Sequence, residues 1–467
     1  MYVKKHDLSW TFGLLTTLLF ISAYGYTIFT DGMFFDGVFY AAIANNLANG
    51  IGTFWEMQYT TTLHASFHEQ PPLALFLQSL FFRLLGDSIY VERLYCFVFA
   101  LLMIWLMIRT WIEVVGKENN YAWLPVILWV IIPLNLWTYQ NNLIELTLGI
   151  LDLAAIFFIL KGCRQNSWTW LLLGGLFTFL AFFSKGLQGL FPIVAPIVYW
   201  IAFRPQHFAK SCLQVMVVTS VPTALIGLLW MYPPANQFFE LYIERRLGGT
   251  FNHLQDTTKS HFYLLYKLGL ELLAPIGLSF IFWFISRKQI PNTRTEIKAV
   301  LFFTGIGLTA SLPLMVTLEQ RPFYLTTSLP YFVLAIGLLA LPYVHSILEK
   351  LKDKKFIVLN YSLTGLIIVA VAFVALSAKN PKREHALISD LSYIRKEIPK
   401  RSIISIPTEM DTRWSLHAYF MRYANISLDV SHKHPYLLMP LEGPTPIDSC
   451  YKQIQIPLQK FALYKCE

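Results

Sequence analysis

The chain has 467 residues, of which 55% are hydrophobic and 14% are charged, and its formal net charge is +9 at pH 7. Soluble domains are normally about 25% charged, so this composition excludes an ordinary soluble enzyme. The positive charge does not indicate nucleic-acid binding, because the basic residues lie in short segments between apolar runs. Runs of about 20 apolar residues can cross a hydrocarbon core of about 30 Å. The sequence therefore predicts an all-α polytopic membrane protein.

Eleven apolar segments are predicted to span the membrane, and the first is expected to be retained because no small-residue cleavage site follows it. The predicted spans are residues 9–29, 90–112, 122–139, 143–160, 167–184, 187–203, 211–232, 265–286, 298–317, 324–345 and 356–378.

The basic residues predict the orientation of these spans. The loops on the N-terminal side carry Lys4, Lys5, Arg109, Lys117, Lys161, Arg164, Arg204, Lys210, Arg287, Lys288, Arg294, Lys298, Lys350, Lys352, Lys354 and Lys355. The opposite loops carry fewer, namely Arg83, Lys185, Arg245, Arg246, Lys259 and Arg321. Because the side richer in Lys and Arg faces the cytoplasm, the N-terminus is predicted to be cytoplasmic. With an odd number of spans, the C-terminal segment lies outside.

The first outer loop, residues 31–89, is predicted to contain two helices that lie in the membrane interface. These are Val38–Asn49 and Pro72–Gly86, and both are too short to span. A second long outer loop covers residues 233–262. The transmembrane domain is therefore expected to comprise residues 1–378 together with these outer loops.

After Ala378 the sequence becomes charged and rich in proline. Short β-like runs lie at residues 402–406, 426–430 and 453–464, and residues 387–396 are typical of a helix. We expect residues 379–467 to form a small soluble α/β domain outside the membrane. Cys450 and Cys466 lie in this domain, where a disulfide between them could persist, and the sequence leaves their pairing open.

Two acidic residues of the first outer loop are candidates for chemistry. Asp36 precedes a predicted helix, where it could be an N-cap or a general base toward an acceptor hydroxyl. Glu69 lies in the stiff segment HEQPP. It could cap the helix that follows, or act with His68 in metal binding or proton transfer. Asp31 is expected to be a solvated helix end.

The fourth predicted span carries two carboxylates on one face, Glu145 and Asp152, about 10 Å apart along the helix axis. Carboxylates within a span are costly and usually face a cavity or a partner. Glu145 could reach the same cavity as Asp36 and Glu69, or it could be a first-turn acid that the helix dipole favours. Asp152 lies deeper and is expected to pair with a donor on another helix.

Several cations lie in the outer loops near the membrane. Lys185 precedes Gly186 in an outer turn, and it could snorkel from a helix end or bind a phosphate. The other outer cations are Arg245, Arg246, Lys259 and Arg321, with His253 among them. Because phosphate needs positive partners and an attacking hydroxyl needs a base, these cations and carboxylates together suit a reaction with an anionic leaving group.

Five short motifs follow one another along the chain. They are an Asp before a Tyr-Ala helix (Asp36, Tyr40, Ala41), an acid before PPL (Glu69), an acid that opens span four (Glu145), SKG after span five (residues 184–186), and Arg-x-x-Tyr before a late span that contains proline (Arg321, Tyr324, Pro330). This order resembles the GT-C superfamily of membrane glycosyltransferases. The nearest branch consists of the ArnT-like and protein O-mannosyltransferase-like enzymes of glycosyltransferase family 39 type. The resemblance extends from Asp31 to about Pro330.

The resemblance implies an inverting glycosyltransferase that moves a sugar from a polyprenyl-phosphate carrier, of the undecaprenyl-phosphate type, to a lipid, glycan or protein acceptor. Transfer would take place on the periplasmic side of a bacterial inner membrane. No cofactor would be required, since the carrier phosphate supplies the leaving group.

The resemblance also implies roles for individual residues. Asp36 would be the base or acceptor-side carboxylate, while Glu69 and Glu145 would line the cavity and could hold a divalent ion. The carrier phosphate would be held by Lys185, Arg245 or Arg246, and Arg321. The substrate cavity would include Tyr40, His68, Gln70, His253 and Tyr324.

Two positions depart from the family pattern. Gln70 stands where the family often has a basic residue before PPL, and Gly37 stands where the mannosyltransferase branch often has a Glu after the Asp. Two other functions remain alternatives: a glycan ligase or polymerase that uses a polyprenyl-diphosphate donor, and a membrane transporter. A transporter would place its polar groups near the midplane and show a repeated half.

Overall fold

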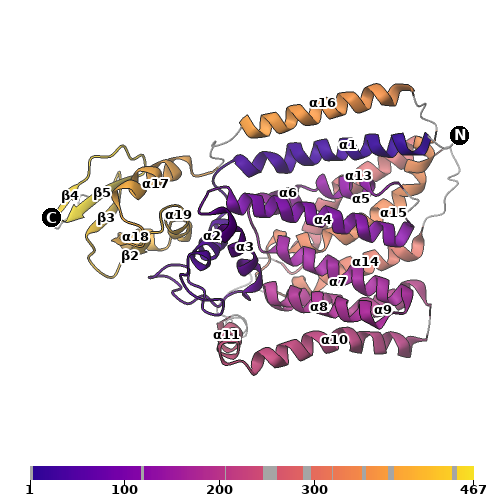
Figure 1. The fold of residues 1–467 in the computed structure, drawn as a ribbon, viewed down its shortest axis with the longest axis horizontal. Coiled ribbons are helices and arrows are strands. Elements are labelled where there is room, and N and C mark those ends of the chain that lie inside the picture. Colours follow the sequence, from indigo (N-terminus) through magenta and orange to yellow (C-terminus); the bar gives the residue numbers. More distant parts are fainter. Residues whose placement is uncertain are drawn as a thin grey trace. The chain divides into compact units, whose positions relative to one another are not determined.

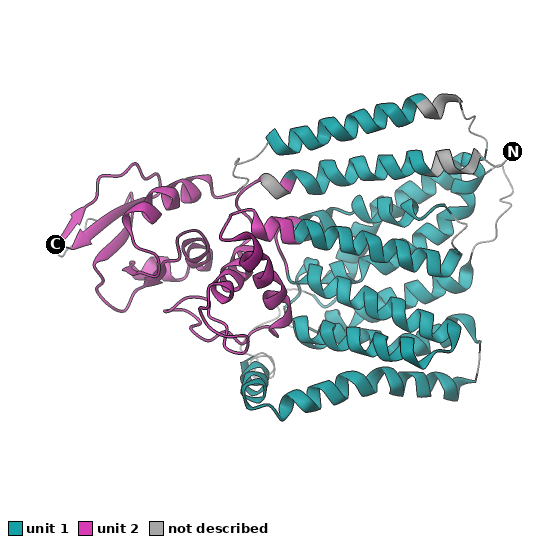
Figure 2. Ribbon diagram, viewed as in Figure 1, with its two compact units in different colours: residues 1–26, 96–139, 144–376 teal, residues 27–95, 140–143, 377–467 magenta. Residues whose placement is uncertain are grey.

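The structure is a computed structural model that describes residues 4–116, 120–205, 207–245, 260–287, 296–317, 319–349, 354–376, 383–443 and 450–466. The chain forms two compact units (Figure 2). Unit 1 comprises residues 1–26, 96–139 and 144–376, and unit 2 comprises residues 27–95, 140–143 and 377–467. Both units therefore combine segments that are distant in the sequence.

Unit 1 is a bundle of helices (Figure 1). Its α-helices are α1 (Lys4–Tyr24), α4 (Val91–Val115), α5 (Trp123–Val130), α6 (Pro133–Gln140), α7 (Glu145–Gln165), α8 (Trp168–Lys185), α9 (Ala195–Phe203), α10 (Phe208–Trp230), α11 (Pro233–Ile243), α13 (Tyr263–Ser286), α14 (Ile297–Ser311), α15 (Leu329–Leu348) and α16 (Lys354–Leu376). The 3-10 helices η2 (Gly186–Val194), η4 (Leu312–Val316) and η5 (Pro322–Thr327) lie between them. The 3-10 helix η1 (Gly25–Phe29) follows α1, and most of it, like the first turn of α4, belongs to unit 2.

The helices agree with the predicted class of membrane protein. Within the described residues, eight helical segments are long and apolar enough to cross a membrane, or nine if α5 and α6 are counted as one bent span. Each predicted span coincides with helical structure, and the span at 122–139 is divided into α5 and α6 with a bend of 73°. The second half begins at Pro133, which has no N–H to continue the preceding helix. The number of helices that cross the membrane stays a prediction.

The centre of unit 1 is formed by α7 and α15, whose residues are largely buried, whereas α13 and α16 leave most of theirs exposed. Helix α7 packs against α8, α9 and η5. It ends at Asn166, which takes a left-handed conformation (φ 52°), and α8 begins two residues later. Helices joined by so short a connection are neighbours that run antiparallel, so the start of α7 and the end of α8 lie at the same end of the pair.

Unit 2 contains helices and one mixed sheet. The helices are α2 (Phe35–Ala48), α3 (Leu73–Leu85), α17 (His385–Glu397), α18 (Thr408–Asp411) and α19 (Trp414–Ala424), and the strands are β1 (Ile403–Ser405), β2 (Ser427–Asp429), β3 (Tyr436–Pro440), β4 (Tyr451–Gln453) and β5 (Phe461–Cys466). The strand order is β2-β1-β3-β5-β4. Strand β1 pairs in parallel with β2 and β3, while β5 pairs antiparallel with β3 and β4.

The fold class predicted for the chain is therefore confirmed: a helical membrane protein with short helices between its apolar spans and a small C-terminal sheet. Helices α2 and α3 match the two helices predicted in the first outer loop, although their place in the interface stays a prediction. The first outer loop and the C-terminal segment belong to one unit, because α2 packs on both α3 and α19. The domain boundary predicted at residue 379 stays a prediction.

Long-range polar contacts hold unit 2 together. Arg422 of α19 is buried and donates to both oxygens of Glu92 (3.1 and 2.9 Å) and to Asp87 (2.8 Å). The hydroxyl of Tyr423 donates to Asp31, which is buried. The expectation that Asp31 is a solvated helix end is therefore wrong, because its carboxylate is buried and hydrogen-bonded. Its partner lies 392 residues away in the sequence.

The pairing of Cys450 with Cys466, which the sequence left open, is present as a disulfide. It joins the start of β4 to the end of β5, which are already paired as neighbouring strands.

The strand β2 carries an acid that should make unit 2 sensitive to low pH. Burial by itself raises the pKa of Asp429, but hydrogen bonds from His434 (2.7 Å) and Ser431 outweigh it and lower the pKa to about 2. An unfolded chain has an ordinary value of about 3.9. The stabilisation is therefore complete above about pH 4 and is lost as the pH falls through 2, and it amounts to about 2 kcal/mol.

We expect the unfolding temperature of the purified protein to fall between pH 4 and pH 2, and this fall to be smaller in the variant Asp429→Asn, which has no carboxyl to protonate. Thermal unfolding followed by circular dichroism in detergent measures both. An identical fall in the variant would show that other carboxyl groups cause it.

Candidate functional site

The ends of α7 and α8 bring together two of the predicted site residues in unit 1. Glu145 is the first residue of α7 and Lys185 is the last residue of α8. The ammonium group of Lys185 donates to the carboxylate of Glu145, and their side chains are only 9% and 1% exposed. The two charges are therefore a buried ion pair, and Lys185 does not snorkel toward solvent.

The predicted cavity residue Tyr324 belongs to the same group. The ammonium nitrogen of Lys185 lies 4.4 Å from the centre of the Tyr324 ring, a distance at which the ring face attracts a cation. The side-chain amide of Gln188 donates to the backbone carbonyl of Tyr324 (3.1 Å) and so fixes η5 against η2. Glu145, Lys185 and Tyr324 thus form one polar cluster in an apolar bundle.

The SKG motif has a structural explanation at each position. Ser184 is buried and its hydroxyl donates to the carbonyl of Ala181 (2.8 Å). Lys185 pairs with Glu145, as described. Gly186 has φ +79°, and a Cβ there would lie 2.1 Å from the hydroxyl of Tyr242 in α11. Only glycine fits at this turn, and it lets the hydroxyl of Tyr242 approach the backbone next to Lys185.

The predicted arginines are more exposed. Arg321 precedes η5 and donates to Glu319 through two nitrogens (2.9 and 2.7 Å), with 52% of its side chain exposed. Arg245 follows α11 and is exposed. Arg246 and His253 lie outside the described residues.

Asp36 lies in unit 2, in the first turn of α2. The N-cap of this helix is Phe34, so the alternative interpretation of Asp36 as the N-cap is wrong. The backbone N–H of Phe34 donates to the side chain of Asn141 (2.7 Å), and the side chain of Asn142 donates to the carbonyl of Gly37 (2.9 Å). Two neighbouring asparagines therefore hold the turn that carries Asp36.

The same contact explains the departure at Gly37. A Cβ at this position would lie 1.9 Å from the backbone oxygen of Asn141. A Glu, which the mannosyltransferase branch often has here, would therefore not fit in this chain. Asn141 and Asn142 were not predicted as site residues, although the polar segment QNN between two apolar segments was a signal of their role.

The other predicted residues of unit 2 lie in or near the segment before α3. Glu69 is half-buried, and its carboxylate lies 3.7 Å from the ring nitrogen of His64. It does not cap α3, whose N-cap is Pro72 without a side-chain hydrogen bond. His68 and Gln70 are buried, and Tyr40 on α2 is half-buried.

The described residues do not assemble into a metal site. Among the described residues, no group of three or more His, Cys, Asp and Glu side chains is placed to hold a metal ion. Of the two acids predicted as ligands, Glu145 already binds the ammonium of Lys185, and a metal ion would have to displace that charge.

Asp152 also differs from expectation. It is fully buried in α7, and neither of its carboxylate oxygens has a hydrogen-bond partner within the described part of the chain. The donor that was expected on another helix is therefore not found there.

Comparison with known proteins agrees with the resemblance. Residues 69–230 match the sequence model of the dolichyl-phosphate-mannose-protein mannosyltransferase family, a range that includes Glu69, Glu145 and Lys185. No curated protein sequence matches the chain.

Solved structures extend the likeness to nearly the whole chain. The chain is similar to ArnT from Cupriavidus metallidurans, solved both bound to undecaprenyl phosphate and in the apo state, with a TM-score of 0.65 and 14% identity. The match with the bound form covers 97% of each chain. It is also similar to the oligosaccharyltransferase AglB from Archaeoglobus fulgidus, with a TM-score of 0.52 and 13% identity over 92% of this chain and 69% of that one. The predicted likeness to GT-C glycosyltransferases is confirmed by the family match and by the fold.

The first prediction from the site concerns the buried ion pair. Removing one partner leaves the other charge buried and unpaired, which costs about 3–5 kcal/mol. We expect Glu145→Gln and Lys185→Gln each to lower the unfolding temperature in detergent, and the double variant to lower it by much less than the sum of the two. Strictly additive losses would show that the two side chains do not stabilise each other.

The second prediction concerns Gly37. We expect Gly37→Ala to lower the unfolding temperature in detergent, because the added methyl group collides with the backbone of Asn141. Gly269→Ala is the matched control, since it lies within a helix and, among the described residues, no atom outside its own helical backbone lies within 4 Å of its added Cβ. Equal stability of the two variants would contradict the close approach at Gly37.

Proposed function

We propose that the chain is a GT-C glycosyltransferase that takes a sugar from a polyprenyl-phosphate carrier and transfers it, with inversion, to a lipid, glycan or protein acceptor on the periplasmic side of a bacterial inner membrane. The observation that carries the proposal is the buried cluster of Glu145, Lys185 and Tyr324 within a fold similar to that of an ArnT bound to undecaprenyl phosphate. The AglB structure, solved with a dolichol-phosphate, supports the same class of carrier.

The proposed reaction is a single displacement. An acceptor hydroxyl or amine attacks the anomeric carbon, and its proton passes to the carboxylate of Asp36. The bond from that carbon to the phosphate oxygen breaks, and the polyprenyl phosphate leaves with the bonding electron pair. A fixed cation near the leaving oxygen stabilises the charge that develops there.

Lys185 is the residue best suited to hold the carrier phosphate. Its position is set by Glu145 on one side and the ring of Tyr324 on the other, so the side chain loses little conformational entropy when a phosphate binds. Glu145 is in this proposal a positioning residue. Arg321 and Arg245 are exposed, and their side chains would have to change conformation to contact the phosphate. The proposed steps involve no metal ion, because the described residues do not offer a set of ligands for one.

Donor turnover in detergent tests the function. Radiolabelled polyprenyl-phosphate sugars, of several sugar types, are incubated with the protein and with candidate acceptors. We expect label to move to an acceptor with the wild type and Asp36→Asn to reduce the rate by at least about 100-fold while donor binding is retained. Glu56→Gln, an exposed acid in the same outer loop, is the matched control and should keep its activity.

The outcomes separate the alternatives. Full turnover by Asp36→Asn would remove Asp36 from the role of base. Transfer only from a polyprenyl-diphosphate donor would show the ligase or polymerase alternative. A parallel reaction with a chelator shows whether transfer depends on a metal ion. Consumption of neither donor would favour a transporter.

A further inference from the structure

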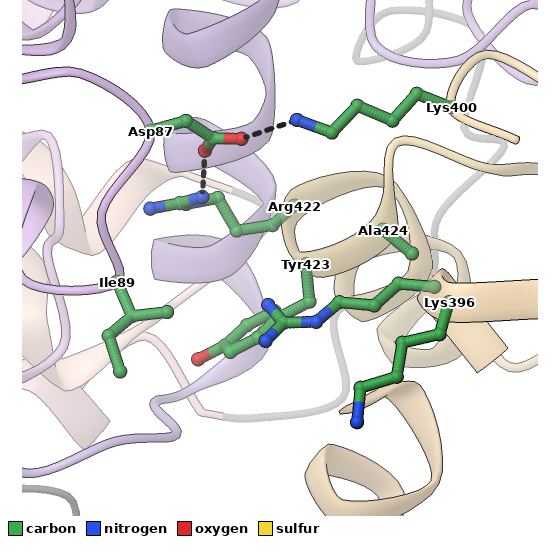
Figure 3. A pocket seen from close by; sticks show the side chains of 8 residues that line it. Asp87, Ile89, Lys396, Lys400, Arg422, Tyr423 and Ala424 are labelled. Atoms are coloured by element: carbon green, nitrogen blue, oxygen red, sulfur yellow. Dashed lines mark hydrogen bonds and ion pairs between the residues drawn. The ribbon is translucent and has the colours of Figure 1, made fainter. Parts of the chain in front are cut away.

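Unit 2 contains a pocket of about 420 Å³ between α17, α19 and the segment before α4 (Figure 3). Its lining consists of Asp87, Ile89, Arg395, Lys396, Lys400, Arg422, Tyr423 and Ala424. Four of these residues are cations and one is an acid, so the lining carries an excess of positive charge. We call it the α17–α19 pocket.

The acid is already engaged by two of the cations. Figure 3 shows Asp87 between Arg422 and Lys400, at 2.8 Å and 3.7 Å from their nitrogens. Arg422 is also bound by Glu92, which lies outside the lining. The negative charge near the pocket is thus used to keep a buried guanidinium in place, and it does not neutralise the remaining cations.

The guanidinium of Arg422 has one more N–H group than it uses in hydrogen bonds within the described residues. A guanidinium has five N–H groups. Four of them are used by Glu92, which takes two, by Asp87 and by the carbonyl of Ser88. One N–H of the nitrogen that binds Asp87 has no acceptor within the described part of the chain.

The other two cations have no carboxylate partner among the residues that the structure describes. Arg395 and Lys396 are exposed in the last turn of α17, and neither forms an ion pair with another residue that the structure describes. The helix dipole explains why cations are favourable in this turn. It does not explain why Lys400 and Arg422, from two other segments, face the same pocket.

The size and the remaining lining indicate what could bind. Small-molecule sites have volumes of about 300–1,000 Å³ and combine apolar or aromatic surface with a few polar groups. The pocket lies within this range, and Tyr423 and Ile89 supply the apolar surface. The hydroxyl of Tyr423 is turned to Asp31 and bonded there.

We propose that the α17–α19 pocket binds an anionic ligand of sugar-phosphate size, with its phosphate oxygens on Arg395, Lys396 and Lys400. Cations hold phosphate through charge-assisted hydrogen bonds, and the ring of Tyr423 lies beside the rest of the ligand. The phosphate could belong to a soluble sugar phosphate or to a lipid headgroup, which offer the same chemistry.

The pocket is separate from the turn that carries Asp36. Asp87 accepts a hydrogen bond from Asn45 (3.1 Å), which lies nine residues after Asp36 on the same helix α2. Nine residues correspond to about 13 Å of rise and two and a half turns, so the two side chains point to opposite sides of α2. The proposal therefore does not rest on the transfer reaction.

Binding without any donor tests the proposal on the full chain in a neutral detergent. One arm titrates glucose 1-phosphate, and the other titrates dihexanoyl phosphatidylglycerol with dihexanoyl phosphatidylcholine as the uncharged reference. The pocket variant is Arg395→Gln with Lys396→Gln. The matched control is Arg413→Gln with Lys465→Gln, which changes the net charge equally at exposed positions outside the lining.

We expect the pocket variant to bind one or both phosphate probes at least about tenfold more weakly than wild type, while the control stays within about twofold and both variants still unfold in a cooperative thermal transition. The probe whose binding is lost identifies the source of the phosphate. Equal binding by wild type and the pocket variant, equal loss in the control, or binding of neither probe by wild type would overturn the proposal.

Discussion

The antiparallel pair of α7 and α8 determines the polar chemistry of unit 1, because it places the start of one helix beside the end of the next. A helix start favours an anion and a helix end favours a cation, so Glu145 and Lys185 each suit their own helix as well as each other. Taking both charges out of water is costly unless they are paired and further contacts compensate. The ring of Tyr324 supplies one such contact. The turn at Gly186 and the amide of Gln188 hold the backbone that makes this arrangement possible.

A comparable constraint acts in unit 2, where Asn141 and Asn142 hold the first turn of α2. The backbone of the two segments approaches so closely that Gly37 cannot carry a side chain. Arg93 adds to this contact by donating to the carbonyls of Gln140 and Gly32. The chain reaches Glu145 three residues after Asn142. A change in this short segment would therefore act on the support of α2 and on the start of α7 together.

Hydropathy was sufficient to predict the helices, because each apolar segment has the length and composition of a span whatever its neighbours are. The motifs identified Glu145, Lys185 and Tyr324 separately, with Glu145 assigned to a cavity with Asp36 and Glu69. They did not predict the ion pair, since the sequence offered Lys185 only as a phosphate ligand or a snorkelling residue. The predicted role of Asp36 stays a prediction. The burial of Asp31 could not be predicted, because its partner Tyr423 is remote in the sequence. Strand β3 was missed because it has only five residues, whereas helix α19 was missed although its residues follow an amphipathic pattern.

Unit 2 combines segments from near both ends of the chain, which has a consequence for biosynthesis. Glu92 is made early, whereas its partner Arg422 follows 330 residues later, and closing so long a loop has an entropic cost. While the ribosome adds the intervening residues, the anions Asp87 and Glu92 and the backbone around α2 lack the contacts that α19 provides. Unit 2 can therefore be completed only after nearly the whole chain has been translated. A nascent chain arrested before α19 would present unpaired carboxylates to the cell's quality-control machinery.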